Sequence, residues 1–261
     1  MPTGRDGFSQ PVRCGTVALV DLHPDVAIGL SAAELRTVRG GLVLPVVRVG
    51  RGPCELAACA AAVEAHGLLG AVVTDGLLIA EMRLAGHVSA QIYGPGDLVS
   101  GDREPDGSLA TAQALHAPVN TSLALLDGRF VAAIRQWPRL AAQFFVQAMR
   151  QVDRAGEHQA ICQLTRVEDR LLALFWYLAD RWGRVRTDAV VIEVPLTHET
   201  IGRLVGARRP TVTLGLRQLA RQGLLCRERD GRWLLAADSV KRVNTEPRGD
   251  GRYPSPVGVA S

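Results

Sequence analysis

The amino-acid sequence predicts an α+β protein with an N-terminal β-barrel, one long helix, and a C-terminal module of short helices and a β-hairpin. Three observations support this fold class. Short apolar runs separated by glycine-containing turns fill residues 17–130, which is typical of a compact, mostly-β domain. From Trp137 the apolar residues follow a helical period. Between Leu196 and Arg242, ten basic residues against four acidic ones give +6, and the total of +4 leaves −2 for the rest.

The composition excludes several classes of protein. With 261 residues, 47% of them hydrophobic and 21% charged, the chain can bury the core of one large domain or two ordinary ones. It is not collagen-like, wholly disordered or a small disulfide-stapled protein. No run approaches 18 uninterrupted apolar residues, and Met1–Gln10 lacks the apolar stretch of a secretory signal. We therefore expect a cytoplasmic protein that makes no membrane contact.

Two short helices are expected within the β-rich region. Ser31 can cap a helix near residues 31–38, because Glu34 stands three positions later, as in a capping box. Residues 55–66 are rich in alanine and are expected to form a helix that ends at Gly67.

Turn signals place the strands of this region. The apolar runs on both sides of Asp75-Gly76 predict a tight β-hairpin, because this pair readily adopts the positive φ angles of the turn. Residues 93–97 form a second turn signal, and strand-like segments follow around 111–115 and 122–126.

An apolar stripe follows the β-rich region. Successive members are alternately three residues and one residue apart, so they share one face of a helix. They are Trp137, Leu140, Ala141, Phe144, Phe145, Ala148, Met149 and Val152. Pro138 suits the first turn of this helix, and Gly156 marks its expected end. The stripe must be covered, either by the β domain or by its copy in a second subunit. We favour a homodimer, formed through Leu140, Phe144, Phe145, Met149 and Val152. A further helix is expected near residues 166–182.

Two short helices separated by a glycine come next. Thr197 is a suitable N-cap, Gly206 allows a sharp turn, and Pro210 fits the first turn of the second helix. The inner faces are apolar: Ile201, Leu204 and Val205 in the first helix, and Val212, Leu216 and Leu219 in the second. Two helices joined in this way, the second basic on its outer side, are typical of a helix-turn-helix.

A β-hairpin is expected directly behind these helices. Asp230-Gly231 lies between two strand-like runs, with arginines near the turn. A hairpin in this place is a wing, which can bring arginines to DNA phosphates or into the minor groove. Together with the local charge of +6, the wing indicates that double-stranded DNA is the partner of this module.

At this point the sequence resembles a known family. Leu196–Leu219 and the following hairpin resemble the DNA-binding domain of the CRP/FNR transcription regulators. Val73–Gly76 and Tyr93–Leu98 are similar to turns of that family's cyclic-nucleotide-binding-like jelly roll, and the helix from Trp137 matches its dimerisation helix. The resemblance covers about residues 40–240.

The resemblance implies a sequence-specific transcription regulator that acts as a homodimer. Its two recognition helices would enter successive major grooves, about 34 Å apart, on a near-palindromic site. RNA polymerase is a further candidate partner. The sequence is thereby divided into a β-barrel sensor domain (1–135), a dimerisation helix (136–157), a winged helix-turn-helix domain (158–242) and a disordered tail (243–261).

The resemblance also suggests DNA contacts, with two departures. Pro210 stands where the family often has glutamate, and Leu214 stands at the place of a frequent arginine. Arg209 could still read a guanine through two hydrogen bonds, and the threonines could touch a thymine methyl or a phosphate. The expected DNA-binding residues are Thr197, His198, Arg208, Arg209, Thr211, Thr213, Arg217 and Arg232. The operator is expected to differ from those of better-known members.

The sensor end departs further from the family. Its cyclic-nucleotide binders hold the phosphate with a Gly-Glu pair and an arginine followed by serine or threonine. Here Gly101-Asp102 stands where Gly-Glu is expected, and between Glu104 and Gly128 His116 is the one basic residue. Without a guanidinium partner, the free-energy cost of removing water from a phosphodiester would not be offset. Cyclic AMP and cyclic GMP are therefore disfavoured. No cofactor is predicted, and the effector is left open.

The five cysteines leave an alternative function open. No CxxC pair occurs, so no zinc ribbon and no metal site is expected. Cys54 and Cys59 lie close together in the sequence, and the alternative is an iron–sulfur or haem regulator that senses redox state through them. No GxSxG, P-loop or HExxH motif occurs, so we do not expect an enzyme.

Overall fold

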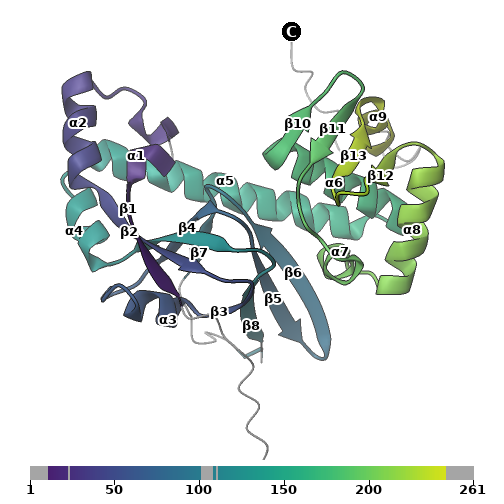
Figure 1. The fold of residues 1–261 in the computed structure, drawn as a ribbon, viewed down its shortest axis with the longest axis horizontal. Coiled ribbons are helices and arrows are strands. Elements are labelled where there is room, and N and C mark those ends of the chain that lie inside the picture. Colours follow the sequence, from purple (N-terminus) through teal and green to yellow (C-terminus); the bar gives the residue numbers. More distant parts are fainter. Residues whose placement is uncertain (1–10, 23, 101–107, 110, 245–261) are drawn as a thin grey trace, which may run out of the picture.

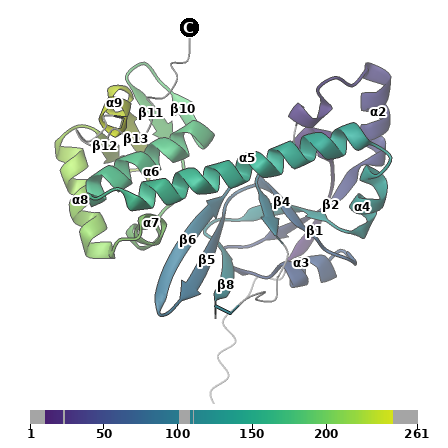
Figure 2. The ribbon, with the colours of Figure 1, turned by 180° about the vertical axis from the view of Figure 1, so that it is seen from behind.

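The computed structural model describes residues 11–22, 24–100, 108–109 and 111–244 of the chain. A β-sandwich and a C-terminal domain lie side by side, and helix α5 (Pro138–Gln163) runs along both of them (Figures 1 and 2). No helix in the described ranges combines the length and the apolar character needed to cross a membrane.

Two antiparallel sheets form the sandwich. The first has the order β1 (Val12–Ala18), β2 (Val43–Val49), β9 (Thr121–Leu126), β4 (Gly70–Asp75) and β7 (Leu98–Ser100). The second has the order β3 (Gly52–Cys54), β8 (Ala112–Ala117), β5 (Leu78–Leu84) and β6 (His87–Tyr93). In the first sheet, Ala71 of β4 pairs with Leu125 of β9. Side chains of both sheets share one core, which helix α3 (Leu56–Ala61) also enters.

Short helices cover the outer face of the first sheet. They are α1 (Leu19–Leu22), the 3-10 turn η1 (Pro24–Ala27), α2 (Ala32–Gly41) and α4 (Gly128–Ile134), joined by the start of α5. The capping box predicted for α2 is present: the Ser31 hydroxyl accepts from the Glu34 N–H at 3.3 Å, and the Glu34 carboxylate accepts from the Ser31 N–H at 2.8 Å.

The hairpin predicted at Asp75-Gly76 was wrong. β4 pairs with β7 and β9, whereas β5 pairs with β6 and β8. Gly76 has the expected positive φ of 81°, and a Cβ there would lie 2.5 Å from the Asn120 carbonyl oxygen. The turn therefore carries the chain from one sheet to the other. The flanking runs are apolar because Val73 and Leu78 contribute to the same core from opposite sheets.

The hairpin of this region lies one strand later. It joins β5 to β6 over Ala85 and Gly86, whose φ angles are 48° and 78°, and the pair Leu84–His87 closes the two-residue loop. Positive φ at both central residues is characteristic of a type I′ turn. The sequence did not reveal this turn because alanine seldom adopts the left-handed region.

Two helices differ in length from the prediction. Helix α3 ends at Ala61 rather than near Gly67, because the chain turns through Glu64, which has φ of 53°. Helix α5 continues through Gly156 to Gln163. An exposed glycine inside a helix costs about 1 kcal/mol relative to alanine, and packing of α5 against α6 (Val167–Trp182) outweighs that cost.

The C-terminal domain combines helices with a small antiparallel sheet. Its helices are α6, α7 (His198–Val205), α8 (Arg209–Arg221), the 3-10 turn η2 (Ala237–Ser239) and α9 (Val240–Val243). Its sheet has the order β10 (Gly183–Val185), β11 (Ala189–Ile192), β13 (Trp233–Ala236) and β12 (Leu225–Arg227). Ile79 and Ile92 of the sandwich share the apolar core of this domain. Gly101-Asp102 and all but the first two residues of the predicted tail lie outside the described residues.

Candidate nucleic-acid interface

Helix α7 begins at a capped residue, as the sequence predicts. The Thr197 hydroxyl accepts a hydrogen bond from the Thr200 N–H at 3.1 Å, which satisfies one unpaired donor of the first turn. The predicted inner-face residues, Ile201, Leu204 and Val205, are fully buried. One face of α7 is thereby fixed against the core while Thr197 stays exposed.

The turn after α7 depends on two glycines. Gly206 has φ of 64°, in the left-handed region that favours glycine. Gly202 lies inside α7, and a Cβ on it would meet the carbonyl oxygen of Ala207 at 2.5 Å. The Ala207 N–H donates to the Gly202 carbonyl at 2.8 Å. This tight return sets the angle at which α8 leaves α7.

Helix α8 is positioned by its inner face. Val212, Leu216 and Leu219 are buried, as the sequence predicts. A Cβ on Gly215 would lie 2.7 Å from Cδ1 of Leu171, so α8 and α6 approach closely at this glycine.

Half of the residues expected to contact DNA lie on the outward side of α8 or at its N-cap. Arg208 is the N-cap residue, and Arg209, Thr211 and Arg217 are exposed on the helix. Among the ion pairs of the described chain, none involves Arg208, Arg209 or Arg217. Their guanidinium groups are therefore open to an external anion.

His198 and Thr213, both expected at the interface, bind each other. His198 Nδ1 lies 3.0 Å from Thr213 Oγ1, and that hydroxyl also donates to the Arg209 carbonyl at 3.0 Å. Because a threonine hydroxyl has one proton, Nδ1 is the donor to it. Burial lowers the pKa of His198, and the positive charges of Arg227, Arg209 and Arg217 lower it further. The pair ties the start of α7 to the first half of α8.

The wing is formed as predicted. β12 and β13 pair in an antiparallel hairpin, and Gly231 in the connecting turn has φ of 91°. Arg229 is exposed in this turn. Arg232 is held by two carboxylates, at 2.7 Å from Asp230 and 3.1 Å from Glu228. For Arg232 to bind a phosphate, it must exchange these partners.

The charge of +6 counted from the sequence exceeds the charge that faces outward. Arg203 pairs with Glu199 at 2.6 Å and with Glu81 of the sandwich. Arg242 pairs with Asp169 at 3.1 Å. Both arginines join parts of the molecule to each other, which the sequence count could not distinguish from a basic surface.

Comparison with known proteins identifies the domain that holds α7, α8 and the wing. The Crp-like helix-turn-helix domain matches residues 165–238. These residues form a Crp-like helix-turn-helix domain. The CRP-like cAMP-activated global transcriptional regulator of Mycobacterium tuberculosis is 32% identical over 113 residues, which are 42% of this chain and 50% of that protein. The chain thus spans about half the length of the curated relatives it matches.

Solved structures show the same fold along most of the chain. FixK2 from Bradyrhizobium japonicum has a TM-score of 0.59 at 18% identity, and the match covers 80% of this chain and 100% of FixK2. A CooA variant from Carboxydothermus hydrogenoformans has a TM-score of 0.58 at 15% identity, with 85% and 93% covered. These likenesses confirm the predicted fold class, which is α+β with an N-terminal β-rich domain, a long helix and a C-terminal helix-turn-helix.

The helix-turn-helix domain of this chain is docked on the sandwich. Helix α7 packs against β6, and Arg203 of α7 forms an ion pair with Glu81 of β5. Glu81 is 7% exposed, and His116 Nδ1 of β8 lies 3.8 Å from the same carboxylate. Burial lowers the pKa of His116, and the charge of Glu81 partly opposes this shift. Glu81 was not singled out in the sequence, although one acid within the apolar run of β5 was a usable signal.

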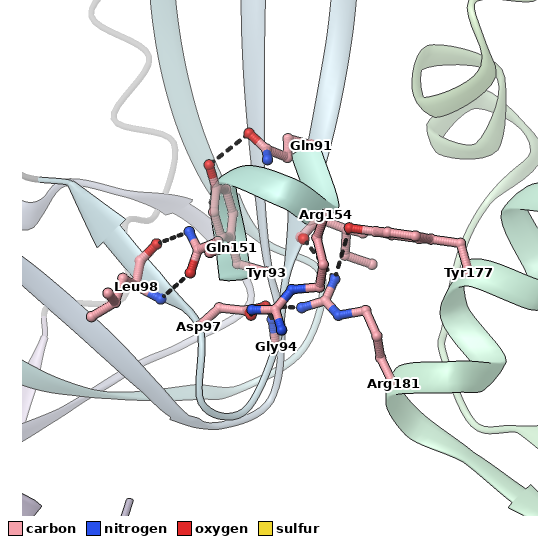
Figure 3. Close-up of polar contacts among 10 residues, drawn as sticks. Gln91, Tyr93, Gly94, Asp97, Leu98, Gln151, Arg154, Tyr177 and Arg181 are labelled. Carbon is pink, nitrogen blue, oxygen red and sulfur yellow. Dashed lines mark hydrogen bonds and ion pairs between the residues drawn. The ribbon is translucent and has the colours of Figure 1, made fainter. Parts of the chain in front are cut away.

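A second polar cluster joins the sandwich to α5 and α6 (Figure 3). Asp97, in the turn between β6 and β7, is 3% exposed and binds an arginine from each helix. Arg154 of α5 lies 3.2 Å from Oδ1, and Arg181 of α6 pairs with Oδ2, which also accepts from the Gly94 N–H at 2.8 Å. Breaking a buried ion pair leaves an uncompensated charge, so the carboxylate fixes both helices relative to the turn.

The backbone beside Asp97 is also held by α5. The side-chain amide of Gln151 donates to the Leu98 carbonyl at 2.6 Å and accepts from the Leu98 N–H at 2.8 Å (Figure 3). On the other side, the indole of Trp182 lies against Gly94 where a Cβ would stand. The turn thus contacts the long helix and the end of α6 together.

An open groove of about 580 Å³ lies between the sandwich and α5. Apolar and neutral polar residues line it, among them Leu98, Phe144, Val152, Tyr93 and Gln151, and no charged side chain stands among its described lining residues. Burial raises the pKa of Tyr93 to about 12, so this phenol is neutral at physiological pH.

The cysteines named in the alternative function lie in the sandwich core. Cys54 and Cys59 are both buried there, and buried thiols have little reactivity. Cys162 donates to the Leu204 carbonyl at 3.2 Å, and burial raises the pKa of its thiol. Within the described residues no group of three or more His, Cys, Asp or Glu could hold a metal ion. This arrangement favours a packing role for Cys54 and Cys59.

Proposed function

We propose that the protein is a homodimeric, sequence-specific DNA-binding transcription regulator of the CRP/FNR type. The outward face of α8 carries the proposal, because Arg208, Arg209 and Arg217 present unpaired charge there on a helix-turn-helix. Recognition helices of this motif present their first residues to base edges in the major groove. Arginine binds both DNA phosphates and the guanine edge.

The DNA contacts divide into three groups. Arg209 reads a base, and Arg208 and Arg217 bind phosphates on either side. Thr197 and Thr211, both exposed, contact the backbone near the starts of α7 and α8. The remaining expected residues act at the edges of the interface. His198 and Thr213 hold α7 and α8 at a fixed angle. Arg232 lies in the wing and acts there.

Homodimerisation through α5 is supported by the exposed part of its apolar stripe. Leu140 is buried against the sandwich, and Phe144 packs beside it. Phe145, Met149 and Val152 are 65%, 45% and 61% exposed. A second copy of α5 would cover these side chains and set the two recognition helices apart at the spacing of successive major grooves.

For the effector, the groove beside α5 favours a neutral or apolar molecule over a cyclic nucleotide. Its described lining offers aromatic and amide groups but no guanidinium for a phosphodiester. The alternative of an iron–sulfur or haem sensor has a direct test, since anaerobically purified protein that holds either group absorbs visible light.

Selection from a pool of random duplexes tests the main proposal. Repeated capture should enrich a near-palindrome whose half-sites are centred about one helical turn apart. Affinity for that site should fall steeply as salt rises, because bound arginines displace counterions. The matched control is Arg36→Ala and Arg51→Ala, which removes two exposed arginines from the sandwich and should leave affinity unchanged. Failure to enrich any sequence over non-specific DNA overturns the proposal.

A further inference from the structure

The centre of the outward face of α8 is a leucine. Leu214 is 64% exposed, while Val212 and Leu216, two positions away on either side, are buried. At 3.6 residues per turn, Leu214 points about 160° away from each of them. It therefore lies opposite the buried face, in the part of α8 that projects furthest from the domain.

The surroundings of Leu214 are basic, but neither Leu214 nor the residue one turn before it offers a hydrogen-bond donor to a base. Arg217 follows one turn later and Arg209 stands at the start of the helix, both exposed. Pro210 lies one turn before Leu214 on the same face and has no N–H. Isolated exposed leucines are common on protein surfaces, but this one occupies the middle of a face whose flanks attract a polyanion.

The major groove offers one apolar group to such a side chain, which is the C5 methyl of thymine. Against the edge of guanine, cytosine or adenine, leucine would displace water from polar atoms and provide no hydrogen bond in return. Against the thymine methyl, the same contact buries apolar surface on both sides.

We propose that Leu214 selects thymine at one position of each half-site through its C5 methyl. This inference rests on the proposed function, because it requires α8 to lie in the major groove. Arg208 and Arg217 then supply affinity through phosphates, Arg209 reads one base through hydrogen bonds, and Leu214 adds a preference at a second base without a hydrogen bond.

Replacing thymine by deoxyuridine tests the contact directly, because it removes the methyl and keeps the base pair. In the duplex selected by the wild-type protein, each thymine is replaced in turn, in both half-sites together. At one symmetric position we expect the wild-type affinity to fall about fourfold per half-site, the equivalent of one buried methyl group. At the other positions the replacement should have a smaller effect.

The variant Leu214→Ala tests the same contact from the protein side. On the thymine duplex, the affinity of this variant should be about fourfold lower per half-site than that of wild type. The variant should bind the thymine and deoxyuridine duplexes equally at that position. Leu214→Arg should shift the selected base there from thymine to guanine, which arginine contacts through two hydrogen bonds. The matched control is Val185→Ala, which truncates a more exposed apolar residue next to the β10–β11 turn and should leave both affinities unchanged.

The outcomes separate this inference from the proposed function. If a near-palindrome is selected but no deoxyuridine replacement weakens wild-type binding, the role of Leu214 is wrong and the regulator proposal stands. Equal sensitivity of Leu214→Ala and wild type to the missing methyl also overturns that role. If no sequence is enriched at all, the proposed function itself fails.

Discussion

Arg203 of α7 forms an ion pair with Glu81 of β5, 122 residues earlier in the chain. The same guanidinium binds Glu199 one turn before it on its own helix, at 2.6 Å. Glu81 is almost fully buried, whereas the side chain of Glu199 is 61% exposed. Arg203 therefore joins α7 to the sandwich through a buried carboxylate, and it forms a second ion pair within α7 through an exposed carboxylate.

The two partners of Arg203 should therefore contribute unequally to stability. We expect Glu81→Gln to lower the free energy of unfolding by about 1–2 kcal/mol, because it leaves a partly buried arginine with its solvent-exposed partner alone. Glu199→Gln, the matched control, should cost about 0.5 kcal/mol or less, as for other exposed helix pairs. Urea denaturation measures both. Equal losses from the two variants would contradict the docking role of Glu81.

Asp97 should matter more than any single surface acid. Asp97→Asn removes the charge that compensates Arg154 and Arg181 together, and we expect a loss of about 3 kcal/mol in the free energy of unfolding. Asp25→Asn is the control, because Asp25 forms an exposed ion pair with Arg150 of the same helix α5. It should leave the urea midpoint within experimental error. A change in Asp97→Asn no larger than in the control would show that the cluster does not hold α5 and α6.

The helix-turn-helix could be predicted from sequence because its determinants are local. Thr197 caps α7, Gly206 adopts the left-handed turn, and Pro210 opens α8, each within a few residues of the element it shapes. The same holds for Ser31 and Glu34 at α2. Patterns of this kind depend on backbone geometry that the neighbouring residues determine.

The pairing of strands and the contacts between domains are not local. Asp75-Gly76 has the chemistry of a hairpin turn whether its strands pair or enter different sheets, and long-range packing decides between the two. Asp97 and Arg181 are 84 residues apart, and nothing in their sequence neighbourhoods marks them as partners. For this reason Arg203 was counted with the basic surface, although it is an internal link.

In the wing, Arg229 and Arg232 should affect DNA affinity by different routes. Arg229→Ala removes an exposed phosphate partner, so it should weaken binding to all sequences and reduce the salt slope by about 1. Arg232→Ala leaves Glu228 and Asp230 without their cation near the DNA, so its loss comes largely from repulsion. When Glu228→Gln and Asp230→Asn are added to the Arg232→Ala variant, its DNA affinity should be restored. The same two substitutions added to Arg229→Ala should leave its loss of DNA affinity in place. Binding titrations at several salt concentrations distinguish the two routes.

The exposed stripe of α5 should determine the oligomeric state. Phe145→Glu and Met149→Glu place charge in a surface that a second α5 would bury, so we expect each to shift the protein from dimer to monomer in sedimentation equilibrium. The control is Leu84→Glu, since Leu84 is an exposed apolar residue at the end of β5, in the hairpin with β6, and it should keep the dimer. A wild-type protein that is monomeric at all concentrations would contradict this prediction.

His158 should make stability depend on pH in the acid range. It lies on α5 with its ring 5.8 Å from that of Tyr177, and burial lowers its pKa, as does the charge of Arg181, while a backbone hydrogen bond at Leu204 opposes the shift. Because the folded-state pKa lies below the unfolded value of about 6.5, the unfolded chain binds the extra proton first. This contribution to stability is therefore complete above pH 6.5 and is lost as the pH falls through the folded-state pKa, by at most about 1.4 kcal/mol per pH unit.

Comparison of two histidine variants isolates this effect from the rest of the acid unfolding. His158→Phe keeps a ring against Tyr177 but cannot take up a proton, so its free energy of unfolding should fall less steeply than that of wild type below pH 6.5. His87→Phe changes an exposed histidine at the start of β6 and should retain the wild-type steepness. Urea denaturation at intervals from pH 7.5 to 5 measures the three curves. Parallel curves for His158→Phe and wild type would mean that the junction of α5 and α6 accepts a charged imidazole as readily as the unfolded chain does.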